Sequence, residues 1–404
     1  MNAGLKRTLT SILCRSLVWT LTLATASPQG PGGLELNVVH YKAPEFPMAG
    51  PLSDASELPS SSHQTHTQAP EASVPSTEWV NSSPLTMSGL RGKVVLIDFW
   101  EYTCINCIRT FAENKKWYER YRQFGFEIIG VHDPEFDIAY SAENVRAAAK
   151  RFGLPYPVVV DSDFRIWKAY NNSTWPNRFL IDAKGFVRFS RPGEGGDSAF
   201  ERVIQQLLQE AHPGLHFPAE YTIATEQNAF APSCGVPTEE MYVGDWFGRG
   251  VLTNSEGYYP GKTLDYKPPG AVEDGHAAVS GRWETDKNGM IYRGKNKESN
   301  RSDKLVMRYH ARELYAVINV SHGKPSHLYI KQDGKDLTTQ NKGEDVQIDS
   351  NGHSYIDVRE PRMYYLVQNT SFGSHTAELT PSRAGLTVNS FTFGNDCQTQ
   401  FPHQ

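Results

Sequence analysis

Cysteine is scarce in this chain, with five among 404 residues. Cys104 and Cys107 form a Cys-x-x-Cys motif, and the sequence contains no second motif of this kind. A structural zinc site needs four ligands, usually two such pairs or one pair with two histidines. His63 and His66 lie in a low-complexity stretch, which does not favour zinc as the role of the motif. We therefore expect neither a metal nor an organic cofactor.

Long apolar runs and basic clusters are lacking as well. After residue 26, no run reaches the ~18 apolar residues of a membrane helix. The formal net charge is −5, and no basic segment is concentrated enough to indicate a nucleic-acid partner. The glycines at 193–196 do not have phosphate-loop spacing, and no acid pair indicates glycoside hydrolysis. These absences favour a mature protein that is soluble, or that is tethered to a membrane only if the export signal remains uncleaved.

The Cys-x-x-Cys motif lies where a strand pattern changes to a helical one. Residues 94–97 are apolar, as in a buried strand, and apolar residues follow helical spacing from Cys107 to Tyr121. A thiol at a helix N-terminus meets unpaired N–H groups and the positive end of the helix dipole, which lower its pKa. The second thiol, almost one turn on, can then resolve a mixed disulfide. The placement predicts thiol–disulfide exchange, with Cys104 attacking and Cys107 resolving.

The length and composition predict two folded domains behind a processed N-terminus. Residues 1–26 read as a signal peptide, with Lys6 and Arg7 before an apolar stretch and Ala24-Thr25-Ala26 before cleavage. Residues 27–76 are rich in Pro, Ser and Thr and predict a disordered arm, in which only 34–41 could form an extended segment. We expect the first domain at 77–211, a linker at 212–232 and a second domain at 233–398.

The first domain alternates strand and helix patterns, which predicts an α/β sheet with helices on both faces. Ser141 is a candidate N-cap, and residues 182–185 form a hairpin signal. The predicted strands are 94–100, 126–131, 158–160, 179–181 and 187–190, and the predicted helices are 108–124, 142–152, 164–170 and 199–209.

The second domain consists of short strand patterns separated by turn residues. Between 278 and 393 these patterns recur at short spacing, for example at 304–311, 313–320, 363–368 and 375–379. Such regularity predicts an antiparallel sandwich. Cys234 and Cys397 bracket the domain, and in an exported protein they could form a disulfide or remain two separate thiols. We favour the disulfide.

The residues around the motif carry a family resemblance. The run from Val94 to Cys107 resembles the active-site segment of the thioredoxin superfamily. FWEYTCINC at 99–107 and GVHDPEF at 130–136 are similar to the soluble part of DipZ-type proteins, in the TlpA-like branch. This resemblance, over about residues 79–393, implies a thioredoxin-like domain followed by a jelly roll that is like a carbohydrate-binding module. Glu101 departs from it, since relatives often carry Thr or Ala there, and its charge should oppose a thiolate.

Three further residues gain a role through the resemblance. Asp98 matches the buried acid that moves protons to and from the second cysteine, although a structural strand-edge aspartate is the alternative. Pro176 matches the family's cis-proline, which shapes the substrate groove, although most proline bonds are trans. Trp100 would wall one side of the site, or else belong to the core. His132, at a strand end, could tune a cysteine or be structural.

The combined expectation is an exported thiol–disulfide oxidoreductase, periplasmic or extracellular, that reduces disulfides of envelope proteins. DipZ-type proteins join such domains to a membrane electron carrier, so we expect a membrane electron donor of the CcdA type. One alternative is a thiol peroxidase, but residues 99–103 lack the proline of the peroxiredoxin motif. The other is a binding protein whose second domain attaches to a glycan or an envelope ligand.

Overall fold

The computed structural model describes residues 41–46, 78–220, 235–244, 251–294, 303–321 and 324–395. The predicted signal peptide, most of the predicted arm, and Cys234 and Cys397 lie outside these ranges. The proposed disulfide between those two cysteines therefore stays a prediction.

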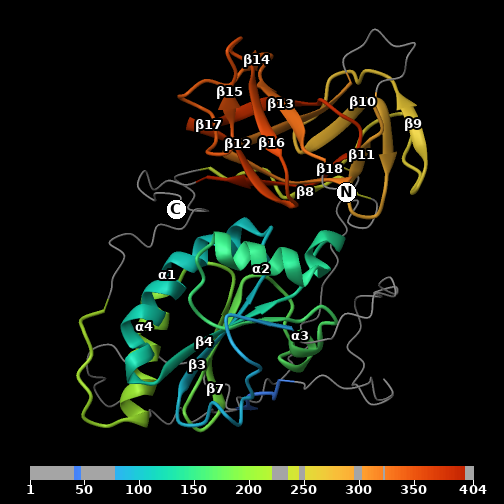
Figure 1. The fold of residues 1–404 in the computed structure, drawn as a ribbon. Helices are drawn as coiled ribbons and strands as arrows, with labels where there is room; N and C mark the ends of the chain where they lie inside the picture. The colour runs from blue at the N-terminus through green and yellow to red at the C-terminus, as the bar shows by residue number, and fades with distance from the viewer. Residues whose placement is uncertain are drawn as a thin grey trace, which may run out of the picture. The chain divides into compact units, whose positions relative to one another are not determined.

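The first domain is a seven-stranded mixed sheet with helices on both faces (Figure 1). The strand order is β1-β7-β6-β3-β4-β5-β2, and β3, β4 and β5 run parallel. The elements are β1 (Tyr41–Lys42), β2 (Glu78–Val80), β3 (Val94–Trp100), α1 (Ile105–Tyr121), η1 (Arg122–Phe124), β4 (Phe126–His132), η2 (Asp137–Tyr140), α2 (Ala142–Arg151), β5 (Val158–Val160), α3 (Arg165–Ala169), β6 (Asn177–Ile181), β7 (Phe186–Pro192) and α4 (Asp197–Ala211).

The central strand β3 is buried along its whole length. Its apolar sequence suits a strand that is covered on both faces. One face packs with Ile166 of α3 in a common apolar cluster. In Figure 1, α1 and α4 lie next to each other, and their Trp117 and Phe200 rings are 5.8 Å apart. The predicted α/β sheet is therefore confirmed, as are its main strands and helices.

Local capping signals also act as the sequence predicts. The Ser141 side chain accepts a hydrogen bond from the Asn144 amide, 3.3 Å away, and caps α2. The 182–185 hairpin joins β6 and β7, and Gly185 takes a φ of 82°, which a glycine adopts without strain.

The predicted disordered arm needs a correction near its middle. β1 pairs antiparallel with β7, so Tyr41 and Lys42 extend the sheet at its edge. Ala43 and Phe46 are buried in the apolar cluster of the first domain. The Glu45 carboxylate accepts hydrogen bonds from the Met87 and Ser88 amides. The apolar residues of this short stretch are thus part of the core. The average composition of residues 27–76 does not reveal this, because the rest of the segment is polar.

The second domain is all-β, and its described strands belong to one 11-stranded antiparallel sheet. They are β8 (Met241–Tyr242), β9 (Thr263–Tyr266), β10 (His276–Thr285), β11 (Met290–Tyr292), β12 (Lys304–Val320), β13 (Ser326–Gln332), β14 (Lys335–Asp336), β15 (Gln347–Ile348), β16 (Ser354–Val358), β17 (Arg362–Pro381) and β18 (Leu386–Gly394).

Part of this sheet closes on itself into a small barrel. β12 pairs with β10, β10 with β11, β11 with β18, and β18 again with β12. The predicted strands 304–311 and 313–320 are in fact one strand, β12, as are 363–368 and 375–379 within β17. An irregularity in register at Ala311 and Glu313 lets β12 change direction without ending. One long strand can therefore join both parts of the sheet.

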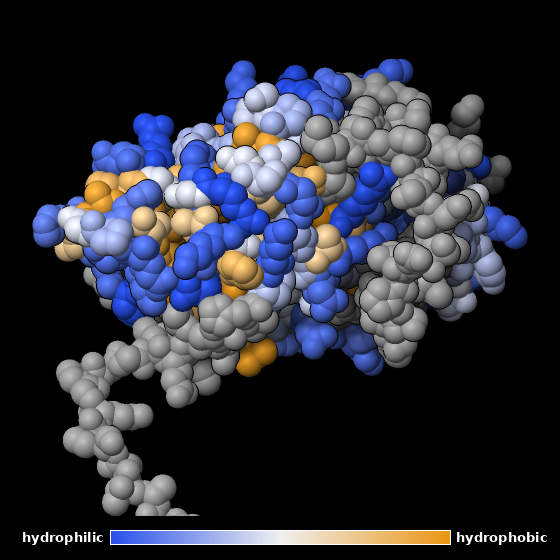
Figure 2. Space-filling model, turned by 90° about the horizontal axis from the view of Figure 1, so that it is seen from below, coloured by the Kyte–Doolittle hydropathy of each residue, from blue (hydrophilic) through white to orange (hydrophobic). Residues whose placement is uncertain are grey.

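Of the helices in the described ranges, none combines the length and the apolarity that crossing a bilayer requires. Figure 2 shows one face of the molecule, on which hydrophilic residues predominate and hydrophobic ones form small separate patches.

Candidate active site

The cysteine pair lies at the start of α1, directly after β3. Cys104 is the N-cap of α1, and its sulfur accepts a hydrogen bond from the Cys107 amide at 3.3 Å. The Cys104 amide donates to the Glu101 carbonyl, also at 3.3 Å. Cys104 is partly exposed and Cys107 is buried, and both are free thiols. The structure thus places the pair where the sequence predicts it, at the junction of β3 and α1.

The pKa values of the two thiols differ from the expected pattern. Burial raises the pKa of Cys104, the Cys107 amide lowers it, and the charges of Glu135 and Glu240 raise it further. The pKa of Cys107 lies well above its ordinary value because of burial, the neighbouring Cys104 and the Asp98 charge. The predicted lowering by the helix N-terminus is therefore outweighed at Cys104. Cys104 still has the lower pKa of the two thiols, as expected for the attacking cysteine, because the pKa of the resolving Cys107 is raised more strongly.

Asp98 lies in the middle of β3 and is completely buried. Its Oδ2 accepts a hydrogen bond from Asn114 Nδ2 at 2.8 Å, and Oδ1 has no hydrogen-bond partner among the described residues. Burial raises its pKa to about 7, although Arg178 and the Asn114 bond act to lower it. The Asp98 charge in turn contributes to the raised pKa of Cys107.

The structure agrees with the predicted cis bond at Pro176, whereas it places Trp100 in the core. The Trp175–Pro176 bond is cis, as the resemblance predicts, and the Pro176 carbonyl accepts a hydrogen bond from the Gly193 amide at 2.8 Å. Trp100 is completely buried and packs edge-on against Phe111 at 5.2 Å. Trp100 therefore belongs to the core behind the cysteines and does not form an exposed wall of the site.

Glu101 and His132 meet behind the cysteine pair. Both side chains are completely buried, and Glu101 Oε1 lies 3.7 Å from His132 Nε2. The other oxygen, Oε2, accepts a hydrogen bond from the Thr103 amide at 2.6 Å. The charge that the sequence places beside the cysteines is therefore directed at a histidine.

The C-terminal domain contributes to the surroundings of the motif. Ile105, between the two cysteines, packs in an apolar cluster with Tyr315 and Tyr365, and Met363 borders this cluster. The two tyrosine rings stack with their centroids 4.4 Å apart. This contact covers one side of the first turn of α1.

An ion pair lies next to that apolar contact. Arg109 Nη2 is 3.1 Å from Glu313 Oε2, and the Glu313 side chain is only 3% exposed. Glu313 also accepts a hydrogen bond from the Tyr365 hydroxyl at 2.9 Å. Arg109 has a second partner in Glu194, at 3.5 Å. The first two turns of α1 are therefore held by both domains.

Two glutamates meet at a tyrosine near Cys104. The Tyr242 hydroxyl lies 2.5 Å from Glu135 Oε1 and 2.9 Å from Glu240 Oε2. Glu135 follows β4 in the first domain, whereas Glu240 and Tyr242 belong to the second. Sequence reasoning passed over these residues, although Glu135 is part of the GVHDPEF run that carries the resemblance. Nothing in the local sequence marks Glu240, Glu313 or Tyr242, because their contacts with the first domain or their effect on Cys104 arise from folding.

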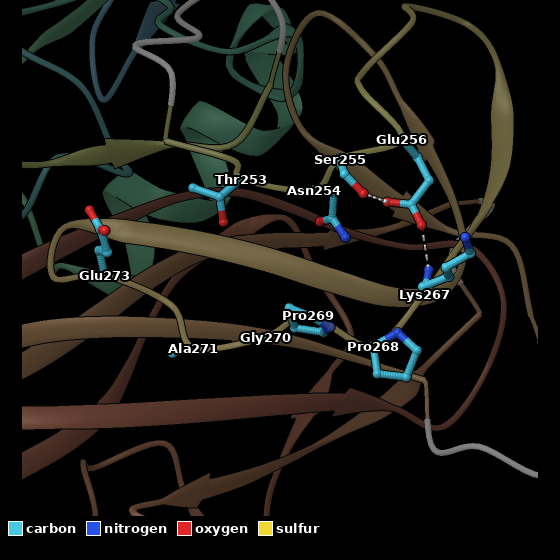
Figure 3. A pocket seen from close by; sticks show the side chains of 10 residues that line it. All are labelled: Thr253, Asn254, Ser255, Glu256, Lys267, Pro268, Pro269, Gly270, Ala271 and Glu273. Carbon is cyan, nitrogen blue, oxygen red and sulfur yellow. Dashed lines mark hydrogen bonds between the residues drawn. The ribbon is translucent and has the colours of Figure 1, made fainter.

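A hollow in the C-terminal domain is separate from the cysteines. It is lined by polar residues and prolines of the loops beside β9 (Figure 3): Thr253, Asn254, Ser255, Glu256, Lys267, Pro268, Pro269, Gly270, Ala271 and Glu273. The Glu256 carboxylate accepts a hydrogen bond from the Lys267 amide at 2.9 Å. None of these ten residues has an aromatic ring on which a sugar could stack. Across the described ranges, no three His, Cys, Asp or Glu side chains form a group that could hold a metal ion.

The α/β sheet and the cysteine pair at the start of α1 define a thioredoxin-like protein. Comparisons with known proteins give its family. Residues 65–190 match the AhpC/TSA family, and residues 238–394 match the family described as thioredoxin like C-terminal domain. The chain is similar to protein DipZ of Mycobacterium bovis, with 34% identity over 324 residues, which cover 79% of this chain and 42% of that protein.

A second relative is similar over most of its own length. The thiol-disulfide oxidoreductase ResA of Geobacillus kaustophilus is 32% identical over 121 residues, which cover 30% of this chain and 67% of that protein. The chain therefore belongs to the thioredoxin-like family of thiol–disulfide oxidoreductases. It spans less than half the length of the DipZ relatives that it matches.

Proposed function

We propose that this protein exchanges disulfides with other proteins through Cys104 and Cys107, and that it acts as a reductase in the cell envelope. The observation that carries the proposal is the partly exposed Cys104 at the start of α1, with the buried Cys107 one turn behind it. The charge of the Asp98 carboxyl contributes to the raised pKa of the second thiol, Cys107.

In the proposed reaction, the Cys104 thiolate attacks one sulfur of a substrate disulfide and expels the other as a thiolate. A mixed disulfide now joins Cys104 to the substrate. Asp98 takes the proton of Cys107, and the Cys107 thiolate attacks the Cys104 sulfur. The substrate leaves with two thiols, having gained two electrons, and the enzyme holds a Cys104–Cys107 disulfide. A membrane electron donor of the CcdA type would return the pair to its reduced form.

Export and the reductive direction are parts of this proposal. Export is supported by Lys6, Arg7 and the Ala24-Thr25-Ala26 cleavage pattern. The reductive direction is supported by the raised thiol pKa values, because an unstabilised thiolate makes the reduced pair a better electron donor. The jelly-roll arrangement and a glycan ligand stay predictions for the second domain, and the polar hollow beside β9 is where we would look for such a ligand.

Insulin reduction tests the chemistry directly. The reduced wild-type protein should reduce insulin disulfides, and Cys104→Ser should lower the rate roughly a thousandfold because the nucleophile is lost. Thr338→Ser, an exposed change in the C-terminal domain, serves as the control and should keep the wild-type rate. Full activity of Cys104→Ser would refute the assignment. Turnover of hydrogen peroxide without insulin reduction would instead favour the thiol peroxidase.

A further inference from the structure

The Glu101 side chain and backbone are placed to fix both cysteines. Its carboxylate accepts hydrogen bonds from the amide and the hydroxyl of Thr103, and its carbonyl accepts one from the Cys104 amide. Its own backbone amide lowers the pKa of Cys107. Three groups of one residue thus shape the turn between β3 and α1. This turn decides where the Cys104 sulfur lies relative to the helix.

The parallel pairing of β3 with β4 brings His132 to this turn. Trp100 and His132 are register partners at the ends of the two strands, so Glu101 emerges beside the imidazole. Glu101 Oε1 and both ring nitrogens of His132 have no hydrogen-bond partner among the described residues. Oε1 nevertheless lies 3.7 Å from His132 Nε2, within the distance of an ion pair.

Two aromatic rings and several acidic groups also lie around this pair. The Tyr102 ring stacks on His132 at 5.5 Å, and the Trp100 ring meets it edge-on at 5.0 Å. Asp133, the next residue after His132, has a raised pKa through burial and the Asp161 charge. Glu135 and Glu240 already oppose the Cys104 thiolate. A completely buried carboxylate without a compensating cation or proton is strongly disfavoured.

We propose that Glu101 is a positioning residue of the cysteine pair, and that His132 neutralises its charge so that no net charge lies behind Cys104. The carboxylate can then organise the Thr103 turn without opposing the thiolate. This inference rests on the proposed thiol chemistry and adds a charge pair on which the reactivity of Cys104 depends.

Alkylation of Cys104 tests the pair without any substrate protein. The reduced protein is treated with iodoacetamide at pH 7, and peptide mass spectrometry separates Cys104 from Cys107. His132→Asn removes the imidazole that faces Glu101, so the negative charge that Glu101 retains should oppose the thiolate and Cys104 should react about tenfold more slowly, which equals one unit in its pKa. Adding Glu101→Gln removes the charge and should bring the rate back to within about threefold of wild type. His327→Asn, an exposed histidine of the C-terminal domain, is the control.

This rescue distinguishes charge compensation from a merely structural role, because a second substitution in the core would not repair a packing defect. A wild-type alkylation rate in His132→Asn would overturn the proposal, and so would a double variant no faster than the single one. His132→Gln is the second choice if the asparagine variant does not fold. As a further measurement, the ring-nitrogen NMR shifts of His132 should change in Glu101→Gln, and unchanged shifts would also overturn the proposal. Insulin reduction by the wild type is unaffected by these outcomes.

Discussion

Asp98 and Glu113 are two buried carboxyls with similar acidity and different surroundings. Burial raises the pKa of each to about 7. The Asp98 charge raises the pKa of Cys107. Glu113 lies on α1, and the charges of Asp197 and Arg178 act on its own pKa. Glu113 is therefore a natural control for the role of Asp98, because both should titrate in the fold at the same pH.

Asp98→Asn should change the pH dependence of both stability and activity. Between the ordinary pKa of 3.8 and the folded value of about 7, the folded state holds a proton that the unfolded chain releases. The free energy of unfolding therefore falls as the pH rises through this window, by on the order of 3 kcal/mol between pH 5 and pH 8. In Asp98→Asn this fall should be smaller, as measured by urea unfolding at both pH values.

The activity should separate Asp98 from its control. Resolution of the mixed disulfide needs an ionised Asp98, so the wild-type rate should rise with an inflection near pH 7. Asp98→Asn should lose this inflection and about a hundredfold in rate. Glu113→Gln should share the change in stability and keep the inflection. Equal pH–rate profiles for the wild type and Asp98→Asn would contradict the proton transfer.

At the scale of the elements, α1 is the helix on which both domains act. Its N-cap is the Cys104 sulfur, and its second turn carries Arg109, which pairs with Glu313 on β12. Arg151 and Glu360 form another ion pair between the domains, but the Glu360 side chain is 48% exposed. The two pairs therefore differ mainly in burial, which decides what an ion pair contributes.

Glu313→Ala should destabilise the protein by about 3 kcal/mol, because the Arg109 cation and the Tyr365 hydroxyl lose a buried partner. Glu360→Ala should cost less than about 1 kcal/mol, as is typical of exposed pairs. Urea unfolding of both variants measures the difference. A double-mutant cycle of Glu313→Ala with Arg109→Ala should give a coupling of roughly 1–3 kcal/mol. Additive effects would show that the pair contributes nothing of its own.

Features set by neighbouring residues could be predicted, and those set by distant pairing could not. The strand before Cys104, the cap at Ser141 and the 182–185 hairpin all follow from local patterns. The docking of residues 41–46 depends on an open edge at β7, which no local pattern reveals. For the same reason, Glu313 and Glu240 could not be assigned to the surroundings of the cysteines, since they are more than a hundred residues away in sequence.

At the scale of the whole molecule, trapping on Cys104 offers a way to identify the substrate. Cys107→Ala removes the resolving thiol, so mixed disulfides on Cys104 should persist. Expressed in its own host, this variant should accumulate adducts with envelope proteins that are released by dithiothreitol, and mass spectrometry would identify them. The Cys104→Ser, Cys107→Ala double variant is the control and should trap nothing. Equal adducts in both variants would show that the trapping does not occur at Cys104.

Ile105, which lies between the two cysteines, packs against Tyr315 and Tyr365 of the second domain. Thermodynamic linkage is reciprocal: if oxidation of the cysteines alters this contact, the contact must alter the reduction potential by the same free energy. The potential is then a property of the complete chain. Exchanging the Ile105-Asn106 dipeptide would therefore change the reduction potential and the affinity of one domain for the other at the same time.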